Sequence, residues 1–246
     1  MKIAQSVILV FTLLFVACGK KSADQMVFVE GGSFYMGTNE QGSDSDEQEL
    51  RCVTVNDFYI SKFEVTQAEW VAIMDYNPSF FHGNDLPVES VSWDDVQLFI
   101  KRLNEKTGRS FRLPTQDEWE YAARGGKFAN EGRMSSLNRL HPKSWMKDNS
   151  EETTHNVGML EPNALGLYDM IGNVHEWCNG LYDSVCYARD SIMNKRYDYV
   201  NIRVFKGGSW ASDSKHCRIS NINYNSRETR NFTVGFRLVE DVTKNN

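Results

Sequence analysis

The stretch RLPTQDEWEYAARGG, residues 112–126, carries signals for both ends of a helix. The hydroxyl of Thr115 precedes the carboxylate of Glu118 by three positions. At this spacing each side chain can accept a hydrogen bond from a free amide of the first helical turn. Gly125 and Gly126 follow, and glycine adopts the left-handed conformation that ends many helices. The stretch therefore predicts a short helix that begins after Thr115 and ends before the glycine pair.

The same start signal occurs twice more, as TQAE at residues 66–69 and as SWDD at residues 92–95. The second of these helices is expected to stop near Thr107-Gly108, because glycine again supplies a left-handed cap. Its apolar residues recur at the spacing of one helical face: Val96, Phe99, Ile100 and Leu103. We therefore expect three helices, of which the second packs along one side.

Short alternating runs at residues 27–29, 34–36, 53–55 and 203–205 are typical of short strands. Much of the remaining chain is rich in Gly, Asn, Asp and Ser, which favour turns. We see no internal repeat. The sequence predicts an α+β domain with few, short strands and a large share of irregular chain.

The N-terminus has the pattern of an export signal. Residues 7–17 form an apolar run broken only by Thr12, after a positive charge at Lys2. This run is about half the ~20 residues that a membrane-spanning helix needs. Small residues before Cys18 resemble a bacterial lipobox, with an ordinary secretory signal as the alternative. We expect a signal peptide at 1–17, lipidation of Cys18, a tether at 18–25, a domain at 26–240 and a tail at 241–246.

The remaining composition excludes some functions. The net charge is −6, with no basic stripe, so nucleic acid is not an expected partner. The acidic stretch at residues 44–49 suggests either a cation site or a solvated loop. Export would allow disulfides to persist, but their pairing among the remaining four cysteines stays open: Cys52, Cys178, Cys186 and Cys217. Their spacing does not suggest structural zinc.

Two further stretches complete a recognisable set, namely GLYDMIGNVHEW at 166–177 and GGSW at 207–210, which closes at GFRL, 235–238. Together with residues 112–126 they resemble the formylglycine-generating enzyme family, also called sulfatase-modifying factors. The resemblance implies a modified C-type-lectin-like fold. For active members it implies oxidation of a sulfatase cysteine to formylglycine.

The resemblance also implies a copper site, from which this chain departs. In the enzymes two cysteines five residues apart bind copper(I), a soft ion that favours thiolates. Here the second cysteine matches Cys217, but the first matches Ser212, whose hydroxyl is a hard, neutral donor. His175 stands where the family has a tryptophan. Ser209 matches the serine of the family's active site. Copper binding is therefore not expected. If the chain is an enzyme, Cys217 and Ser209 are its catalytic candidates; a new metal site of Cys217, His216 and His175 is a weaker alternative.

A calcium site is the second implication. Two carboxylates, Asp169 and Glu176, bracket a Gly-Asn turn that can aim backbone carbonyls at one point. Calcium accepts such mixed oxygen ligands. The matching family positions bind calcium through side chains at Asp169 and Glu176 and through carbonyls at Gly172 and Val174. The alternative is that the two carboxylates only cap turns.

Residues 211–233 invite a binding interpretation, because small polar and aromatic side chains on a rigid frame suit ligand recognition. The candidates are Ser212, Asp213, His216, Asn223, Tyr224 and Asn225. The segment also resembles the variable segment of retroelement-diversified lectin-fold proteins. Asn-rich turns are, however, also what an irregular segment needs in order to fold.

The sequence thus predicts a lipid-anchored protein of the bacterial cell envelope whose domain binds a ligand, a glycan or another envelope protein. The alternative is a copper- or other metal-dependent oxidase acting on exported sulfatases. A purely structural envelope component is a third class. The serine at position 212 separates the first two hypotheses, because it removes one of the two thiolates that copper(I) needs.

Overall fold

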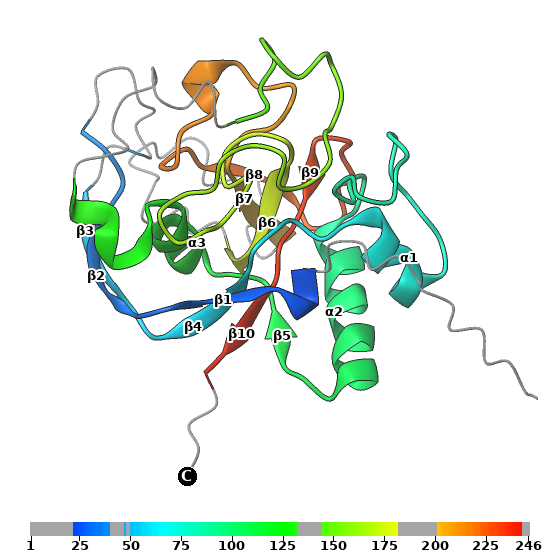
Figure 1. The fold of residues 1–246 in the computed structure, drawn as a ribbon, viewed down its shortest axis with the longest axis horizontal. Coiled ribbons are helices and arrows are strands. Elements are labelled where there is room, and N and C mark those ends of the chain that lie inside the picture. Colours follow the sequence, from blue (N-terminus) through cyan, green and yellow to red (C-terminus); the bar gives the residue numbers. More distant parts are fainter. Residues whose placement is uncertain (1–21, 40–46, 48–49, 132–143, 182–200, 243–246) are drawn as a thin grey trace, which may run out of the picture.

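The computed structural model describes residues 22–39, 47, 50–131, 144–181 and 201–242 (Figure 1). Within these ranges the α-helices are α1 Gln67–Met74, α2 Trp93–Thr107 and α3 Gln116–Ala123. The strands are β1 Met26–Val29, β2 Gly32–Met36, β3 Arg51–Val55, β4 Phe58–Ser61, β5 Phe111–Arg112, β6 His175–Leu181, β7 Ile202–Lys206, β8 Asn223–Ser226, β9 Val234–Gly235 and β10 Val239–Asp241. The predicted α+β class and all four predicted strands are confirmed.

The strands form two four-stranded sheets and one two-stranded sheet. The first sheet has the order β1-β4-β10-β5 and is antiparallel. The second has the order β8-β7-β6-β9, in which β6 runs parallel to β9 and antiparallel to β7. Strands β2 and β3 pair with each other. Strand β10, near the end of the chain, lies between β4 and β5 in the interior of the first sheet (Figure 1).

The helix starts follow the local pattern of the sequence. Thr66, Ser92 and Thr115 each accept a hydrogen bond from the amide three residues ahead, and the facing carboxylate binds the cap amide in return. Helix α2 ends at Gly108, whose φ is 71°. All three predicted helices are therefore confirmed, with the predicted N-caps. Helix α3 is capped by Arg124 in the right-handed conformation, and Gly125, with a φ of 98°, follows that cap.

Two apolar clusters make up the core. One surrounds α3 and includes Trp119. The other lies between α1, α2 and the end of the chain, where Trp70 stacks on Phe99 with ring centroids 5.1 Å apart and Phe236 meets both rings edge-on. Burying one such side chain stabilises the fold by about 1.5–3 kcal/mol. The predicted apolar stripe of α2 faces this second cluster, because all four of its residues belong to it: Val96, Phe99, Ile100 and Leu103.

Contacts and secondary structure extend to both sides of the predicted domain boundaries, which stay a prediction. The 3₁₀ turn Ser22–Asp24 packs on the domain, because Arg109 donates to the carbonyl of Ala23 at 2.6 Å and the amide of Lys62 to that of Gln25 at 2.8 Å. Strand β10 also runs one residue past the predicted end at 240. These contacts attach residues 22–25 and the last residue of β10 to the folded domain.

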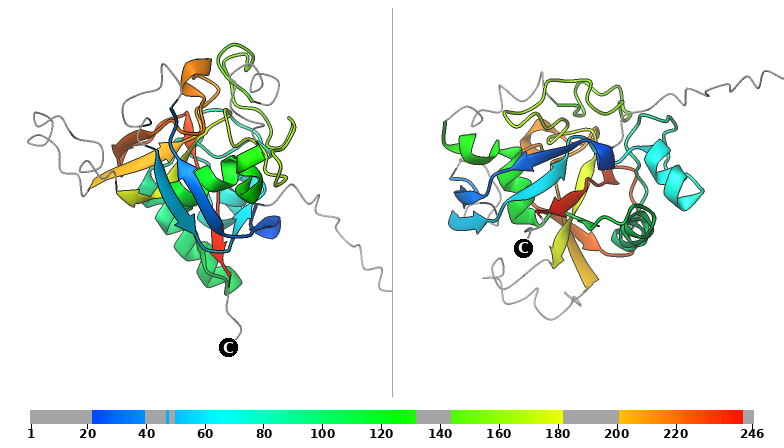
Figure 2. Two further views of the ribbon diagram at one scale, coloured as in Figure 1. Left: turned by 90° about the vertical axis from the view of Figure 1, so that its left-hand side faces the viewer. Right: turned by 60° about the horizontal axis from the view of Figure 1, so that its bottom comes forward.

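The predicted signal peptide, Cys18 and the first residues of the tether lie outside the described residues. Within the described part of the chain, no helix combines the length and apolar character needed to cross a membrane. The long loops of residues 144–174 and the 3₁₀ helix Ser214–His216 gather at one end of the molecule (Figures 1 and 2). That end carries the candidate site.

Candidate functional site

The GGSW stretch begins where β7 ends, and its glycines allow a close approach to Cys217. Gly207 and Gly208 have φ values of 96° and 75°, a conformation that favours glycine. A Cβ atom on Gly208 would lie 2.7 Å from the sulfur of Cys217. A side chain at position 208 is therefore excluded by contact with this cysteine as well as by backbone conformation.

Three polar side chains meet beside this turn. The hydroxyls of Ser209 and Ser212 are 3.1 Å apart, and the Ser212 hydroxyl also accepts from the Ser209 amide at 3.1 Å. Nε2 of His175, the first residue of β6, lies 3.5 Å from the same hydroxyl. The structure thus brings the candidates Ser209, Ser212 and His175 together. His216 has an exposed side chain on the neighbouring 3₁₀ helix.

Burial shifts the pKa values of two of these groups. Burial raises the pKa of the Cys217 thiol to about 12, so it is protonated at neutral pH. Burial lowers the pKa of His175 to about 4, so its ring is neutral. Copper(I) in the enzymes needs two thiolates. The described site offers one thiol, at Cys217, and a hydroxyl, at Ser212, so the residues present do not fit that ion.

The cysteines are not cross-linked with one another in the described part of the chain. Cys52, Cys178 and Cys217 carry free thiols, the first exposed and the other two buried. Cys186 lies outside the described residues. Because Cys217 is buried, packing shields its thiol from solvent.

Comparisons with known proteins identify the family of the chain. A family model described as "Sulfatase-modifying factor enzyme 1-like domain" matches residues 12–242. The chain belongs to this family. The predicted formylglycine-generating-enzyme-like, modified C-type-lectin-like fold is thereby confirmed.

Three relatives show the range of this sulfatase-modifying-factor family. "Chaperone protein LppX" of Paenibacillus barcinonensis is 30% identical, over 80% of this chain and 82% of that protein. The "Formylglycine-generating enzyme" of Streptomyces coelicolor is 28% identical, over 63% of this chain and 52% of that protein. The solved structure "Treponema denticola variable protein 1" has a TM-score of 0.74 at 27% identity, covering 88% of this chain and 95% of that one.

The predicted calcium ligands of the family have other partners here. Both oxygens of Glu176 accept from Arg237 at 2.6 Å, and one also accepts from Trp119. Asp169 accepts from the amide of Gly158 at 2.6 Å. A calcium ion would have to share Glu176 with a guanidinium, which reduces the negative charge available to it. No group of three His, Cys, Asp or Glu residues in the described ranges is arranged to hold a metal. Calcium, with Gly172 and Val174 as carbonyl ligands, stays a prediction.

The predicted binding residues lie on two separate elements. Ser212 and Asp213 precede the 3₁₀ helix that carries His216, and Asp213 pairs with Lys147 at 3.1 Å. Asn223, Tyr224 and Asn225 lie on β8, the outermost strand of the second sheet. Tyr224 is 48% exposed. The predicted binding residues therefore lie in two places, at the 3₁₀ helix Ser214–His216 with the residues before it and on an edge strand of the second sheet.

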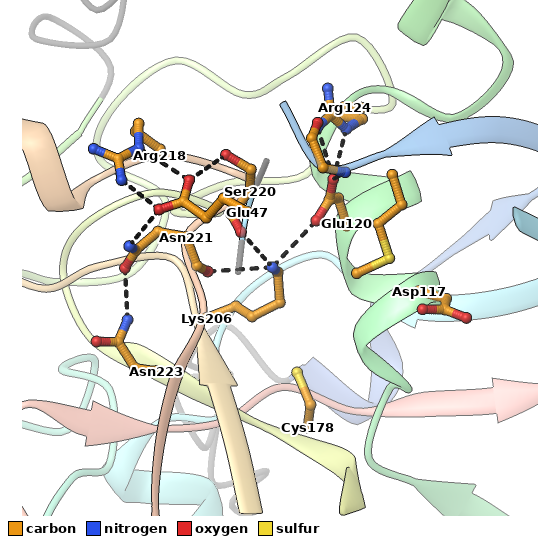
Figure 3. Close-up of polar contacts among 12 residues, drawn as sticks. Glu47, Asp117, Glu120, Arg124, Cys178, Lys206, Arg218, Ser220, Asn221 and Asn223 are labelled. Carbon is orange, nitrogen blue, oxygen red and sulfur yellow. Dashed lines mark hydrogen bonds and ion pairs between the residues drawn. The ribbon is translucent and has the colours of Figure 1, made fainter. Parts of the chain in front are cut away.

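A buried polar network anchors the segment between these two groups (Figure 3). Lys206 on β7 pairs with Glu120 on α3 at 3.2 Å, and both side chains are fully buried. The Lys206 ammonium also donates to the carbonyls of Ser220 and Asn221 at 3.3 and 3.2 Å. The chain that leads into β8 is therefore fixed to the core by a buried charge.

Glu47 is one of the residues of this network that sequence reasoning missed. The acidic stretch 44–49 suggested a cation site or a solvated loop, yet Glu47 is 1% exposed and accepts from Arg218, Ser220 and Asn221. Burial alone would raise its pKa, but these hydrogen bonds and the Arg218 charge hold that pKa near 2. For Glu47 both sequence-based interpretations are wrong, because its partners are more than 170 positions away in the chain.

Four aromatic rings lie beside the Ser209 turn, and we call them the aromatic quartet: Phe80, Phe81, Trp210 and Phe232. Their centroids are 5.0 Å apart for Phe80–Phe81, 5.4 Å for Phe81–Trp210, 5.8 Å for Trp210–Phe232 and 5.7 Å for Phe232–Phe80, so the contacts form a closed cycle. Phe80 is 67% exposed and Phe232 is 44% exposed. In the sequence, the adjacent pair Phe80-Phe81 within a polar stretch was the signal that could have indicated this cluster.

Proposed function

We propose that this chain is a lipid-anchored protein of the bacterial cell envelope whose sulfatase-modifying-factor domain binds another protein. The proposal rests on the position that matches the first copper-binding cysteine of the enzymes. Ser212 occupies this position, with its hydroxyl near the hydroxyl of Ser209 and near Nε2 of His175, and Cys217 is buried. The site can donate and accept hydrogen bonds, but it lacks the thiolate pair of the enzymes.

Relatives support this choice. One relative bears the name "Chaperone protein LppX", which denotes action on another protein, and matches most of its own length. Another, from Bos taurus, is named "Inactive C-alpha-formylglycine-generating enzyme 2" and is 30% identical over 62% of this chain and 50% of that protein. The relatives of this chain therefore include one that is named as inactive and one that is named as a chaperone.

A direct assay separates the binding function from the oxidase alternative. Incubated with copper(I), oxygen and a sulfatase-type cysteine peptide, the parent chain should leave the peptide mass unchanged. Ser212→Cys should bind more copper(I) than the parent, because it supplies the missing thiol. A parent-dependent mass loss of about 18 Da, the change from thiol to aldehyde, would establish the oxidase and contradict the proposal; the softness of copper(I) is the reason for expecting none.

The binding arm uses a denatured, carboxymethylated model protein as the probe. The detergent-solubilised full chain should reduce light scattering as this probe aggregates, whereas an equal mass of an unrelated folded protein should not. Equal scattering in both samples would count against a protein-binding function. This measurement does not depend on which face of the domain makes the contact.

The anchor is expected at Cys18, where a short apolar run meets a cysteine preceded by small residues. Mass spectrometry of the N-terminal peptide should show acyl chains on Cys18, and Cys18→Ala should leave the membrane fraction or remain unprocessed. Several chains are expected, since one alone gives only marginal binding. Cys52→Ala is the matched control and should fractionate like the parent. Unmodified Cys18 in the membrane-bound protein would contradict the anchor.

A further inference from the structure

The predicted tether enters the folded domain through a fixed turn. The carbonyl of Ala23 accepts from Arg109 at 2.6 Å, and the carbonyl of Gln25 accepts from the amide of Lys62 at 2.8 Å. Ala23 also packs against the second apolar cluster. Residues 22–25 are therefore fixed to the domain, so the fold sets the point at which the tether leaves it.

A row of side chains crosses the first sheet beside this turn. Phe28 on β1 and Glu240 on β10 both lie directly opposite Tyr59 on β4. Direct partners in an antiparallel pair present their side chains on one face of the sheet, and the rings of Phe28 and Tyr59 are 5.4 Å apart. Arg109 binds both oxygens of Glu240 and the carbonyl of Ala23. The row therefore leads from the two rings to the point where the tether enters.

Phe28 is exposed where the solvated face of an antiparallel sheet normally carries a polar residue. It is 47% exposed, whereas the next residue, Val29, points to the other face and is fully buried. Further along the row, Phe111 is buried in the second cluster, and the Arg109 guanidinium lies 4.2 Å from the centre of its ring. This face is thus covered at β5 and open at Phe28 and Tyr59, which we call the open aromatic pair.

The length of the chain places a membrane within reach of the open aromatic pair. Cys18, the proposed site of lipidation, precedes Ser22 by four positions, and four residues span at most roughly 14 Å in any conformation. Phe28 follows Gln25, the last residue of the fixed turn, by three positions, which is about 10 Å along a strand. With a lipid on Cys18, phospholipid headgroups therefore have a high effective concentration beside the pair.

We infer that the open aromatic pair lies against the headgroups of the membrane that holds the lipid of Cys18, and that this contact gives the domain a fixed orientation on the membrane. The inference rests on the proposed lipid anchor. Aromatic side chains suit the boundary between headgroups and acyl chains, where an apolar ring is buried and a tyrosine hydroxyl stays hydrated. The two charges of the row, Arg109 and Glu240, pair with each other. The contact is therefore apolar and changes little with salt.

The test uses photochemical cross-linking to lipid. Benzoylphenylalanine, a photoreactive analogue of phenylalanine, takes the place of Phe28 in the full chain, which is reconstituted into vesicles of phosphatidylethanolamine and phosphatidylglycerol. Tyr224 is the matched control position, since it is 48% exposed but lies on β8 of the second sheet. Mass spectrometry should find phospholipid adducts at position 28 at least about tenfold more often than at position 224, because the tether concentrates lipid at the first position.

Two changes in the chain that carries the photoreactive residue at position 28 test the fixed turn. Ten Gly-Ser residues inserted between Lys21 and Ser22 should lower the adduct yield at least about threefold, because a flexible linker of this length adds roughly 17 Å of mean reach. Arg109→Met should also lower the yield, because the turn loses its side-chain donor. Arg51→Met is the control, since its partly exposed pair with Asp117 lies on β3 and α3, and it should leave the yield unchanged. Melting curves report whether each variant folds.

The outcomes separate the membrane contact from the anchor. Equal adduct yields at positions 28 and 224, on a chain whose Cys18 carries acyl groups, would overturn the inference while the anchor stands. Loss of the adduct at high salt would overturn it too, because the contact would then be electrostatic. An unchanged yield in the insertion variant would contradict the role of the fixed turn. If Cys18 carries no lipid in the membrane-bound protein, the anchor and the inference both fail.

Discussion

Replacing Arg237 by methionine should destabilise the domain by about 3–5 kcal/mol or prevent it from folding, the cost expected when one partner of a buried ion pair is removed. The guanidinium is fully buried and binds both oxygens of Glu176. It also donates to the carbonyls of Ser61 and Tyr168, at 3.1 and 2.9 Å. Denaturant unfolding monitored by circular dichroism measures the loss.

The loss should be large because other carboxyl groups surround the same guanidinium. Burial, with the charges of Asp169 and Glu176, already raises the pKa of Glu64 well above its usual range, and the Arg237 charge opposes this rise. Without Arg237 the remaining carboxylates would repel one another in the core. Arg230→Met is the control, because the Arg230 side chain is 59% exposed and its pair with Asp95 should be worth about 1 kcal/mol or less. Equal losses in the two variants would contradict this account.

Lys206→Met should lower the free energy of unfolding by about 3 kcal/mol, the lower end of the range for a broken buried pair. The ammonium is fully buried with Glu120, but Glu120 keeps a second partner in Arg124 at 2.7 Å. The carbonyls of Ser220 and Asn221 would lose their donor. Hydrogen exchange should therefore speed up most in the chain leading into β8.

Two further variants test this explanation. Lys206→Met combined with Glu120→Gln should recover part of the lost stability, because the buried carboxylate that has lost one of its two cationic partners is neutralised. Lys127→Met is the control, since its pair with Glu30 is exposed on both sides and should contribute little. If the exchange near β8 stayed at the parent rate in Lys206→Met, the anchoring role of Lys206 would be wrong.

The sequence by itself determined the local structure and the family. The starts of α1, α2 and α3 were readable because a capping box joins groups only three residues apart, as at Thr115 and Glu118. The serine at the position of the family's first copper-binding cysteine could be recognised for a similar reason. Ser212 and Cys217 lie in one short segment whose pattern of glycines and tryptophan fixes their alignment with the family.

Only the tertiary structure decided how the site is built. Glu47 meets Arg218, Lys206 meets Glu120, and the aromatic quartet draws rings from three distant segments. Nothing in the chain near Glu47 or Phe80 identifies those partners. Local hydrogen-bonding patterns are encoded within a few residues, whereas these contacts depend on which loops the two sheets bring to the same end. The sequence therefore gives the candidate residues, and the packing selects which of them lie together.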